Sequence, residues 1–389
     1  MLVEQINIIS LIVIFFSYIF SFFFFNKIDK NFFNFIFFYH LLFCLVYFLY
    51  SSHYPADSQE YYERSLQKFY DLKAGSYFII NLVRLFSYYL NFSYFNCFLI
   101  FNLIGTIGVL FFYLALKEIS NIKQNKKNYF FIIIILLPSI YFWSSAIGKD
   151  ALSFLSICIF IWSSVNLKNR INFIILATIL MFLVRPHIAP IMSTSLFISL
   201  IFYSKFNLKN KILYMIISTS ITLLTASYAF KYIGIPDFIS YYPFQINFQS
   251  LLDFISRREI ANQSLTAGVD ISLMNPFMKI FTYLYRPLPF EVKNIYQLFA
   301  SIENILLIIV CFFGILGLFN KDYYSGENQS RLILVIYTIF TLIILSYTSA
   351  NLGVNSRQKW MIFPVILTLV FQFSYEKKII FNLKKFNNK

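Results

Sequence analysis

The sequence predicts an all-α protein, a polytopic bundle of about 11 transmembrane helices with a large extracytoplasmic loop or cap. Three observations lead to this prediction. Hydrophobic residues make up 59% of the chain, and charged residues only 13%, whereas soluble domains carry about a quarter. Mean hydropathy is +0.68. Apolar runs of roughly 18 residues or more recur from end to end. We therefore treat residues 1–389 as one membrane domain.

The apolar runs set the predicted spans, which are 5–25, 35–50, 94–116, 129–145, 148–166, 171–185, 188–204, 212–230, 298–319, 331–349 and 358–375. The first run has no basic segment before it and no small-residue cleavage site, so we expect a retained span. The first outer loop is predicted at 51–93, and its stretch 76–92 has the amphipathic spacing of an interfacial or re-entrant helix.

Charge divides the connecting loops into two alternating sets. One set holds 18 basic and five acidic residues, a net of +13, and the other set has a net of +2. Positive charge collects on the cytoplasmic side of membrane proteins. We therefore predict a multi-pass membrane protein with its N-terminus outside and its C-terminus in the cytoplasm. The surplus charge lies in short inner loops, so it does not indicate a nucleic-acid partner.

The four cysteines all lie within apolar runs and form no C-x-x-C pair. We interpret them as small buried hydrophobic residues rather than disulfides or zinc ligands. No metal site is predicted. No cofactor is implied with certainty, and a divalent metal is left open.

The stretch 231–297 is too polar to cross a bilayer, yet it is rich in Ile, Leu, Phe and Tyr. A disordered linker would have fewer such residues. We predict a folded extracytoplasmic cap between the eighth and ninth spans. Its aromatic residues include Tyr241, Tyr242, Phe244, Tyr283 and Tyr285.

Seven of the nine arginines fall on the predicted outer side, where the orientation rule disfavours them. The guanidinium group is a planar fork that can hold a phosphate or carboxylate at two points. An anion site at the outer leaflet is therefore one interpretation, and surface ion pairs with the outer acids are the other.

The first outer loop contains Asp57, Glu60 and Arg64 at helical spacing. A carboxylate at the membrane boundary could act as a general base. Asp57 could equally be a helix N-cap with Glu60 as its capping-box partner. Sequence alone leaves both possibilities open.

Two short outer turns supply further candidates. Lys149 and Asp150 begin a span, where ionisable residues are costly and usually functional, although a simple helix cap would also explain the acid. Arg185 ends a span in the sequence R-P-H, and His187 follows Pro186. We expect Arg185 to contribute more than His187, which could be only a hydrogen-bonded boundary residue.

The cap and the last outer turn complete the predicted substrate-binding set. Glu303 is a further costly acid, near the start of the ninth span. The predicted substrate-binding residues are Glu60, Arg64, Arg257, Arg258, Arg286, Glu291 and Arg357. The predicted catalytic residues are Asp57, Lys149, Asp150, Arg185 and His187.

The segments PADSQEYY, WSSAIGKD, RPH, RPLPFE and RQ together resemble those of bacterial O-antigen and capsule repeat-unit polymerases, and more distantly C-type (GT-C) glycosyltransferases. The likeness covers most of the chain in topology, through short motifs. It implies an enzyme of surface polysaccharide biosynthesis in the bacterial inner membrane that takes an undecaprenyl-(pyro)phosphate-linked sugar or oligosaccharide donor and a glycan acceptor at the extracytoplasmic face. The aromatic residues of the predicted cap would then stack on sugar rings.

The resemblance also implies roles for individual residues. In C-type glycosyltransferases an acidic residue of the first outer loop lies near the acceptor, and Asp57 occupies that place. That family often has two adjacent acids there, which this chain lacks. The arginines at 185, 257, 258, 286 and 357 would hold the lipid pyrophosphate or the growing chain.

Two other classes remain as alternatives. A transporter or flippase of lipid-linked oligosaccharide should carry midplane charges and repeated halves, and neither is evident in the sequence. An acyltransferase would use His187 as a base, but the predicted cytoplasmic side has no convincing H-x-x-x-D pair to support it.

Overall fold

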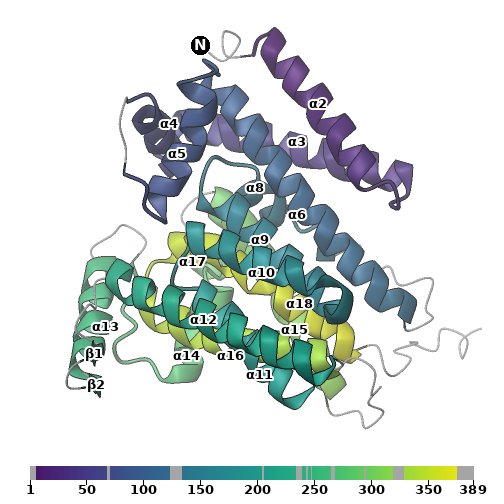
Figure 1. The fold of residues 1–389 in the computed structure, drawn as a ribbon. Coiled ribbons are helices and arrows are strands. Elements are labelled where there is room, and N and C mark those ends of the chain that lie inside the picture. The colour runs from purple at the N-terminus through teal and green to yellow at the C-terminus, as the bar shows by residue number, and fades with distance from the viewer. Residues whose placement is uncertain are drawn as a thin grey trace, which may run out of the picture.

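The computed structural model describes residues 6–67, 71–122, 134–203, 206–233, 239–241, 244–246, 248–263, 268–292, 295–318 and 328–374. Within these ranges the chain is helical apart from one short hairpin and the connecting turns (Figure 1). Part of the predicted span 129–145 lies outside the described residues, and so do the basic residues at the C-terminus.

The elements follow one another along the chain with short connections. They are α2 (Ile8–Phe24), α3 (Lys30–His53), α4 (Asp57–Ser65), α5 (Ser76–Ser87), α6 (Tyr94–Ile122), α8 (Pro138–Ser144), α9 (Lys149–Val165), α10 (Leu167–Val184), α11 (Ala189–Phe202), α12 (Leu208–Ile233), β1 (Ile239–Tyr241), β2 (Phe244–Ile246), α13 (Phe248–Gln263), α14 (Pro276–Tyr285), η2 (Pro289–Glu291), α15 (Ile295–Leu318), α16 (Asn328–Thr348), α17 (Leu352–Gln358), η4 (Lys359–Met361) and α18 (Phe363–Ser374).

Six of the described helices, α3, α6, α10, α12, α15 and α16, are long and apolar enough to cross a membrane. The pair α8 and α9 would make a seventh, although the chain bends by 120° between them. Each predicted span overlaps a helix, but α2, α11 and α18 are shorter apolar helices. The structure therefore supports a helical multi-pass bundle and does not establish the count of about 11.

Helix α9 is the central helix of the bundle. It packs against α6, α8, α10, α16 and α18, and 12 of its 17 residues are buried. Four of the buried residues are serines, including Ser153 and Ser156, whose small side chains keep the surface of the helix narrow. Ser156 Oγ also donates to the Ala177 carbonyl of α10 at 2.7 Å. Small residues allow membrane helices to approach closely.

Two glycines of α6 permit its contact with α8 and α9. A Cβ added at Gly105 would overlap the Ser144 carbonyl oxygen, and one at Gly108 would lie 2.9 Å from Phe154 Cδ1. These positions therefore set how close the three helices can come.

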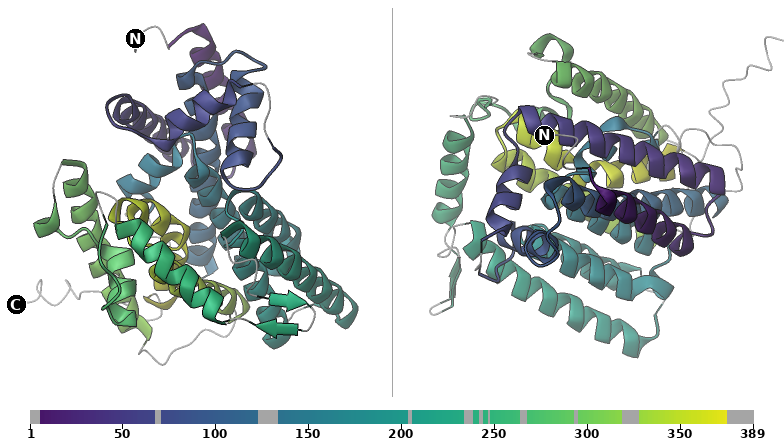
Figure 2. Two further views of the ribbon diagram at one scale, coloured as in Figure 1. Left: turned by 90° about the vertical axis from the view of Figure 1, so that its left-hand side faces the viewer. Right: turned by 90° about the horizontal axis from the view of Figure 1, so that it is seen from above.

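The helices α4, α5 and α13 and the hairpin lie on the left-hand side of Figure 1. The left panel of Figure 2 looks onto this face, with the violet and blue N-terminal helices above and the green and yellow helices below. We call it the loop face. It carries the ends of α3 and α10 and the starts of α9 and α15, which the sequence assigns to the outer side.

A bidentate ion pair marks the other end of the bundle. Arg170 donates from its two terminal nitrogens to Glu118 at 2.8 and 2.7 Å, and its guanidinium stacks on the Trp162 ring at 3.8 Å. The sequence assigns Glu118 and Arg170 to the inner side. Arg170 lies near the start of α10, and Arg185 directly follows its last residue. The length of α10 therefore separates the two ends of the bundle.

The predicted cap contains secondary structure of its own. Strands β1 and β2 pair antiparallel, with Ile239 opposite Ile246, and α13 and α14 follow. Val269 donates to the Ala350 carbonyl at 2.8 Å, which ties the segment between α13 and α14 to the start of α17. The side chains of Tyr241 and Phe244 lie outside the described residues, as does Tyr242.

Candidate functional site

Arg357 joins two carboxylates that are far from it in the sequence. It lies in the last turn of α17, a short helix capped by the Asn351 side chain, which accepts from Gly353 N at 3.0 Å. Arg357 Nη1 lies 2.6 Å from Asp57 Oδ2, and Nε lies 3.3 Å from Asp150 Oδ2. The segment between α16 and α18 is thereby held against the segment between α3 and α6, both of which the sequence predicts to be outer.

Asp150 is shared by a second arginine. Arg185 Nη2 lies 2.6 Å from Asp150 Oδ1, and Arg185 Nε donates to Ser153 Oγ at 3.2 Å. The side chain of Arg185 is 5% exposed and that of Asp150 16% exposed. Water can therefore do little to solvate either charge, and each depends on its partner. We call Asp57, Asp150, Arg185 and Arg357 the ion-pair network.

The helix termini explain why these side chains meet. Gly148 starts α9, which puts Asp150 in the first turn, where a negative charge is favoured by the helix dipole. Arg185 ends α10 as its C-cap, next to Pro186, which cannot continue the helix. The two charges thus come from opposite ends of adjacent helices.

The alternative in which Asp57 is an N-cap is wrong. The N-cap of α4 is Ala56, without a side-chain hydrogen bond, and Asp57 is the first helical residue. Glu60 pairs with Arg64 at 3.0 Å instead of closing a capping box. Asp150 likewise follows the N-cap Gly148 and bonds to arginines rather than acting as a cap.

The electrostatics of the network keep Arg357 charged. The carboxylate of Asp150, assisted by Asp57, raises the pKa of Arg357 further above its ordinary value, against the opposing effect of burial. Lys149, the first residue of α9, interacts electrostatically with all four members of the network. Three cations and two carboxylates leave a surplus of one positive charge. Such a surplus favours an anionic ligand.

A narrow cleft adjoins the network. Asp150 and Arg357 line it together with the aromatic side chains of Trp143, Phe154 and Trp360. The indole N–H of Trp360 is buried and has no hydrogen-bond partner in the described part of the chain.

Tyrosines enclose the network on the side of α3 and α4. Tyr47 and Tyr61 both interact electrostatically with Asp57, Asp150 and Arg357. Burial raises the pKa of Tyr61 to about 12, so its hydroxyl stays protonated. The sequence analysis missed both, because tyrosines are frequent throughout the chain.

Other predicted residues lie elsewhere on the loop face. His187 stacks on Tyr232 of α12, with ring centroids 6.4 Å apart. Arg286 pairs with Glu291, whose Oε2 accepts from Leu288 N at 2.8 Å. Burial alone would raise the pKa of Glu291, but the hydrogen bond from Arg286 and that from the Leu288 backbone lower it below its usual value. Arg286 and Glu291 form no hydrogen bond or ion pair with the ion-pair network within the described ranges.

The remaining substrate-binding candidates are exposed or undescribed. Arg64 and Glu60 form a solvated i,i+4 pair, which contributes little to stability. Arg257 is exposed on α13, and its Nε donates to the Asp253 carbonyl at 3.2 Å. The side chain of Arg258 lies outside the described residues.

A second buried polar group lies between α8, α15 and η4. Glu303 Oε2 accepts from the Ser139 hydroxyl at 2.8 Å and from its backbone N–H at 3.1 Å. Lys359, also buried, donates from Nζ to Asn304 Oδ1. Oε2 of Glu303 is thereby satisfied and joins α8 to α15. Oε1 is buried with no hydrogen-bond partner in the described part of the chain, so these bonds offset only part of the cost noted in the sequence.

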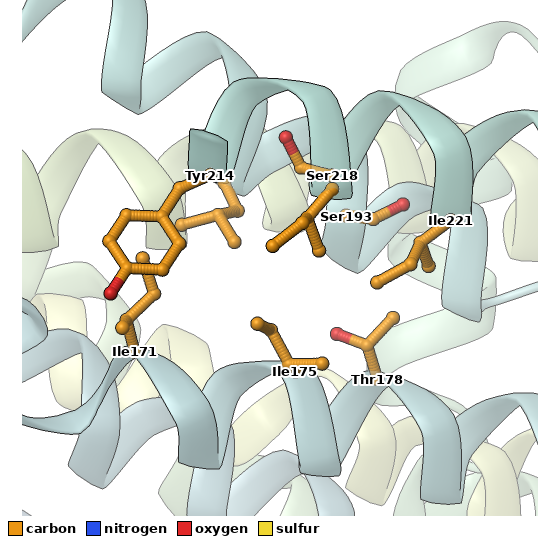
Figure 3. Close-up of a pocket in the computed structure, with 9 residues that line it drawn as sticks. Ile171, Ile175, Thr178, Ser193, Tyr214, Ser218 and Ile221 are labelled. Carbon is orange, nitrogen blue, oxygen red and sulfur yellow. The ribbon is translucent and has the colours of Figure 1, made fainter. Parts of the chain in front are cut away.

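A further gap lies within the membrane-spanning part, between α10, α11 and α12 (Figure 3). It is mostly apolar, with Ile175 on one side and Ile221 on the other, and the hydroxyls of Thr178 and Ser193 bond within the chain. It holds no charged side chain, so it does not extend the ion-pair network.

All four cysteines are buried and unpaired, as the sequence predicts. No group of three or more His, Cys, Asp or Glu side chains that could hold a metal ion occurs among the residues that the structure describes. The two carboxylates of the ion-pair network face arginines.

Comparison of the chain with protein-family models, with curated proteins and with solved structures gave no match. The fold and the site therefore define the class. Several long apolar helices indicate a multi-pass helical membrane protein, and one end of its bundle carries a partly buried network of two carboxylates and two arginines, with a lysine beside it.

Proposed function

We propose that this protein is a membrane glycosyl-transferring enzyme of surface polysaccharide biosynthesis, acting at the extracytoplasmic face on an undecaprenyl-(pyro)phosphate-linked donor. Both a repeat-unit polymerase and a GT-C-like single-sugar transferase fit this proposal. The observation that carries it is the ion-pair network, with Lys149 beside it, at one end of a membrane-spanning bundle.

The charges suit a donor that is anchored in the bilayer. A polyprenyl pyrophosphate keeps its tail among lipid chains and its phosphates at the boundary, where Lys149, Arg185 and Arg357 supply fixed positive charge. In glycosyl transfer the bond between the anomeric carbon and the pyrophosphate oxygen breaks, and negative charge develops on the departing pyrophosphate. Preorganised cations stabilise that charge most when water is excluded.

A carboxylate is required on the acceptor side. The acceptor oxygen forms the new bond to the anomeric carbon and loses its proton. Asp57 is the most accessible acid of the network, with its side chain 50% exposed and one oxygen facing Arg357. Its other oxygen can accept the proton as a general base. We therefore assign Asp57 to the acceptor, and Arg185 and Arg357 to the donor phosphates.

The alternative is a flippase of lipid-linked oligosaccharide. One observation favours it, the 120° bend between α8 and α9 with Asp150 directly after it. Discontinuous helices with ionisable groups at the break are typical of transporter binding sites. The bend coincides with the predicted outer turn rather than with the midplane, and we rank this function second for that reason.

The glycan profile of a strain that lacks the gene tests the proposal. A single repeat unit in place of a ladder indicates a polymerase, and a unit missing one sugar indicates a transferase. Complete lipid-linked units held on the cytoplasmic face would favour the flippase, and an unchanged profile would refute the proposal. Complementation with Arg357→Gln should fail and with Arg64→Gln should succeed, because only Arg357 belongs to the network.

The proposed orientation has a separate test. Single cysteines at Arg64 and Lys168 should react with a membrane-impermeant maleimide in whole cells only at position 64. The native cysteines are buried, which keeps the background low. Labelling at 168 but not at 64 would reverse the topology.

A further inference from the structure

Three tyrosines form a compact cluster between the end of α3 and the start of α15. Tyr50 and Tyr54 stack with ring centroids 5.0 Å apart and planes at 22°. Tyr296 meets Tyr50 edge-on at 5.1 Å and Tyr54 at 5.7 Å. Phe142 of α8 supports the cluster from behind, 5.7 Å from Tyr50. We call these three residues the tyrosine cluster.

The tyrosine cluster keeps its outer rings and its hydroxyls available. Tyr54 is 47% exposed and Tyr296 40% exposed. Elsewhere on the loop face, tyrosine hydroxyls bond within the protein, as Tyr62 does with the Phe92 carbonyl at 3.0 Å. Within the described ranges, the hydroxyls of the tyrosine cluster have no hydrogen-bond partner. An amphipathic surface of this kind combines a flat apolar face with unsatisfied polar groups.

The tyrosine cluster adjoins the ion-pair network. Tyr47, one turn before Tyr50 on α3, contacts it at 5.7 Å and interacts electrostatically with Arg357, Asp150 and Asp57. Asp57 follows Tyr54 by three residues. A molecule lying on the exposed rings would therefore have one end near the acid that we assign to the acceptor.

The cap aromatics that the sequence suggested are less suitable. Tyr283 is 1% exposed, and Tyr285 packs against Phe363 at 5.9 Å. Both side chains stabilise the contact of α14 with the bundle. Of the described tyrosines next to Asp57, those of the cluster keep exposed faces.

We propose that the tyrosine cluster is a saccharide-binding platform that holds a sugar ring of the acceptor glycan beside Asp57. The ring face of tyrosine is electronegative, and the C–H bonds on one face of a pyranose are weakly positive, so the two surfaces attract. The free hydroxyls can bond to sugar hydroxyls. Tyrosine gives a large rigid contact with little loss of side-chain entropy. This inference rests on the proposed function, whose acceptor it locates.

Binding to the full-length protein in lipid nanodiscs tests the platform directly. The probe is a set of oligosaccharides released by mild acid from the surface polysaccharide of cells that carry this gene, measured by saturation-transfer NMR. We expect Tyr54→Ala and Tyr296→Ala each to weaken binding about two- to tenfold, and the double variant by about the product. Tyr54→Phe keeps the ring and should lose no more than about threefold.

Tyr89→Ala is the matched control, because Tyr89 is 66% exposed but lies outside the tyrosine cluster. Its ring meets that of Tyr88 edge-on, with the two ring centroids 5.2 Å apart. It should bind like the wild type. Wild-type affinity in both cluster variants, or no binding by the wild type, would overturn the platform. Equal weakening of binding by Tyr89→Ala would also overturn the platform, because it is the result expected if these tyrosines only form an aromatic belt at the lipid interface.

The binding test and the deletion test fail independently. An unchanged glycan profile in the deletion strain would refute the transferase function even if the tyrosines bind sugar. A changed profile, with undiminished binding by the tyrosine variants, would refute only the platform.

Discussion

Replacing Asp150 with asparagine removes the one negative charge that lies between Arg185 and Arg357 while keeping the size of the side chain. Among the described residues, the Arg185 side chain would retain only its hydrogen bond to the Ser153 hydroxyl at 3.2 Å, and Arg357 would retain Asp57. Removing one partner from a buried pair leaves an uncompensated charge and costs about 3–5 kcal/mol. Because Arg357 keeps a second acid, we expect about 3 kcal/mol for Asp150→Asn.

Thermal unfolding of the purified protein in nanodiscs measures this cost. A loss of about 3 kcal/mol corresponds to a midpoint lower by roughly 3–5 °C in a chain of this size, because the unfolding entropy grows with chain length. Arg185→Met should be destabilising for the same reason. The double variant should be less destabilised than the sum of the singles by about 1–3 kcal/mol, because each single change strands a charge that the double change removes.

Additive effects of Asp150→Asn and Arg185→Met would refute this reasoning, since independent residues add. A single variant with an unchanged midpoint would show that solvent or lipid compensates the charge. Arg64→Met is the control and should shift the midpoint little, because its ion pair with Glu60 is solvated.

Two further predictions concern packing and pH. Gly105→Ala should destabilise the bundle by about 1–3 kcal/mol, because the added Cβ would overlap the Ser144 carbonyl oxygen. Gly148→Ala is the control and should be nearly neutral, because the nearest neighbour of its added Cβ is 4.0 Å away. Equal melting points of the two variants would contradict the close approach of α6 and α8. The pKa of Glu291 is lower in the folded protein than in the unfolded chain, where it is about 4.3. The ion pair of Glu291 with Arg286 therefore stabilises the fold fully above about pH 4.3, and this stabilisation is lost as the pH falls through the lower folded-state pKa. Glu291→Gln should therefore show a smaller fall in melting temperature between pH 6 and pH 3 than the wild type.

Several features of the fold follow from the sequence alone. Apolar runs and turn residues fix where helices form, since a bilayer requires every backbone N–H and C=O to be bonded within a helix. The start of α9 at Lys149 and the end of α10 before Arg185 agree with the sequence prediction. The number of membrane crossings does not follow, because short apolar helices such as α11 can lie inside a bundle without spanning it.

Residue type and side of the membrane also marked Asp57, Asp150, Arg185 and Arg357 as candidates, but sequence could not say which of the outer charges meet. Pairing of Asp57 with Arg357 depends on how the ends of separate helices pack. Three hundred residues lie between them, and no local pattern encodes that contact.

The sequence by itself therefore determined the class of protein, its helical segments and the chemistry available at one end, since these depend on local composition and hydropathy. Only the tertiary structure decided that two arginines share Asp150, that Arg286 pairs with Glu291 apart from them, and that Tyr50, Tyr54 and Tyr296 cluster beside Asp57. The physical reason is that side chains on separate helices meet through rotation and packing of the helices, which local propensity does not specify.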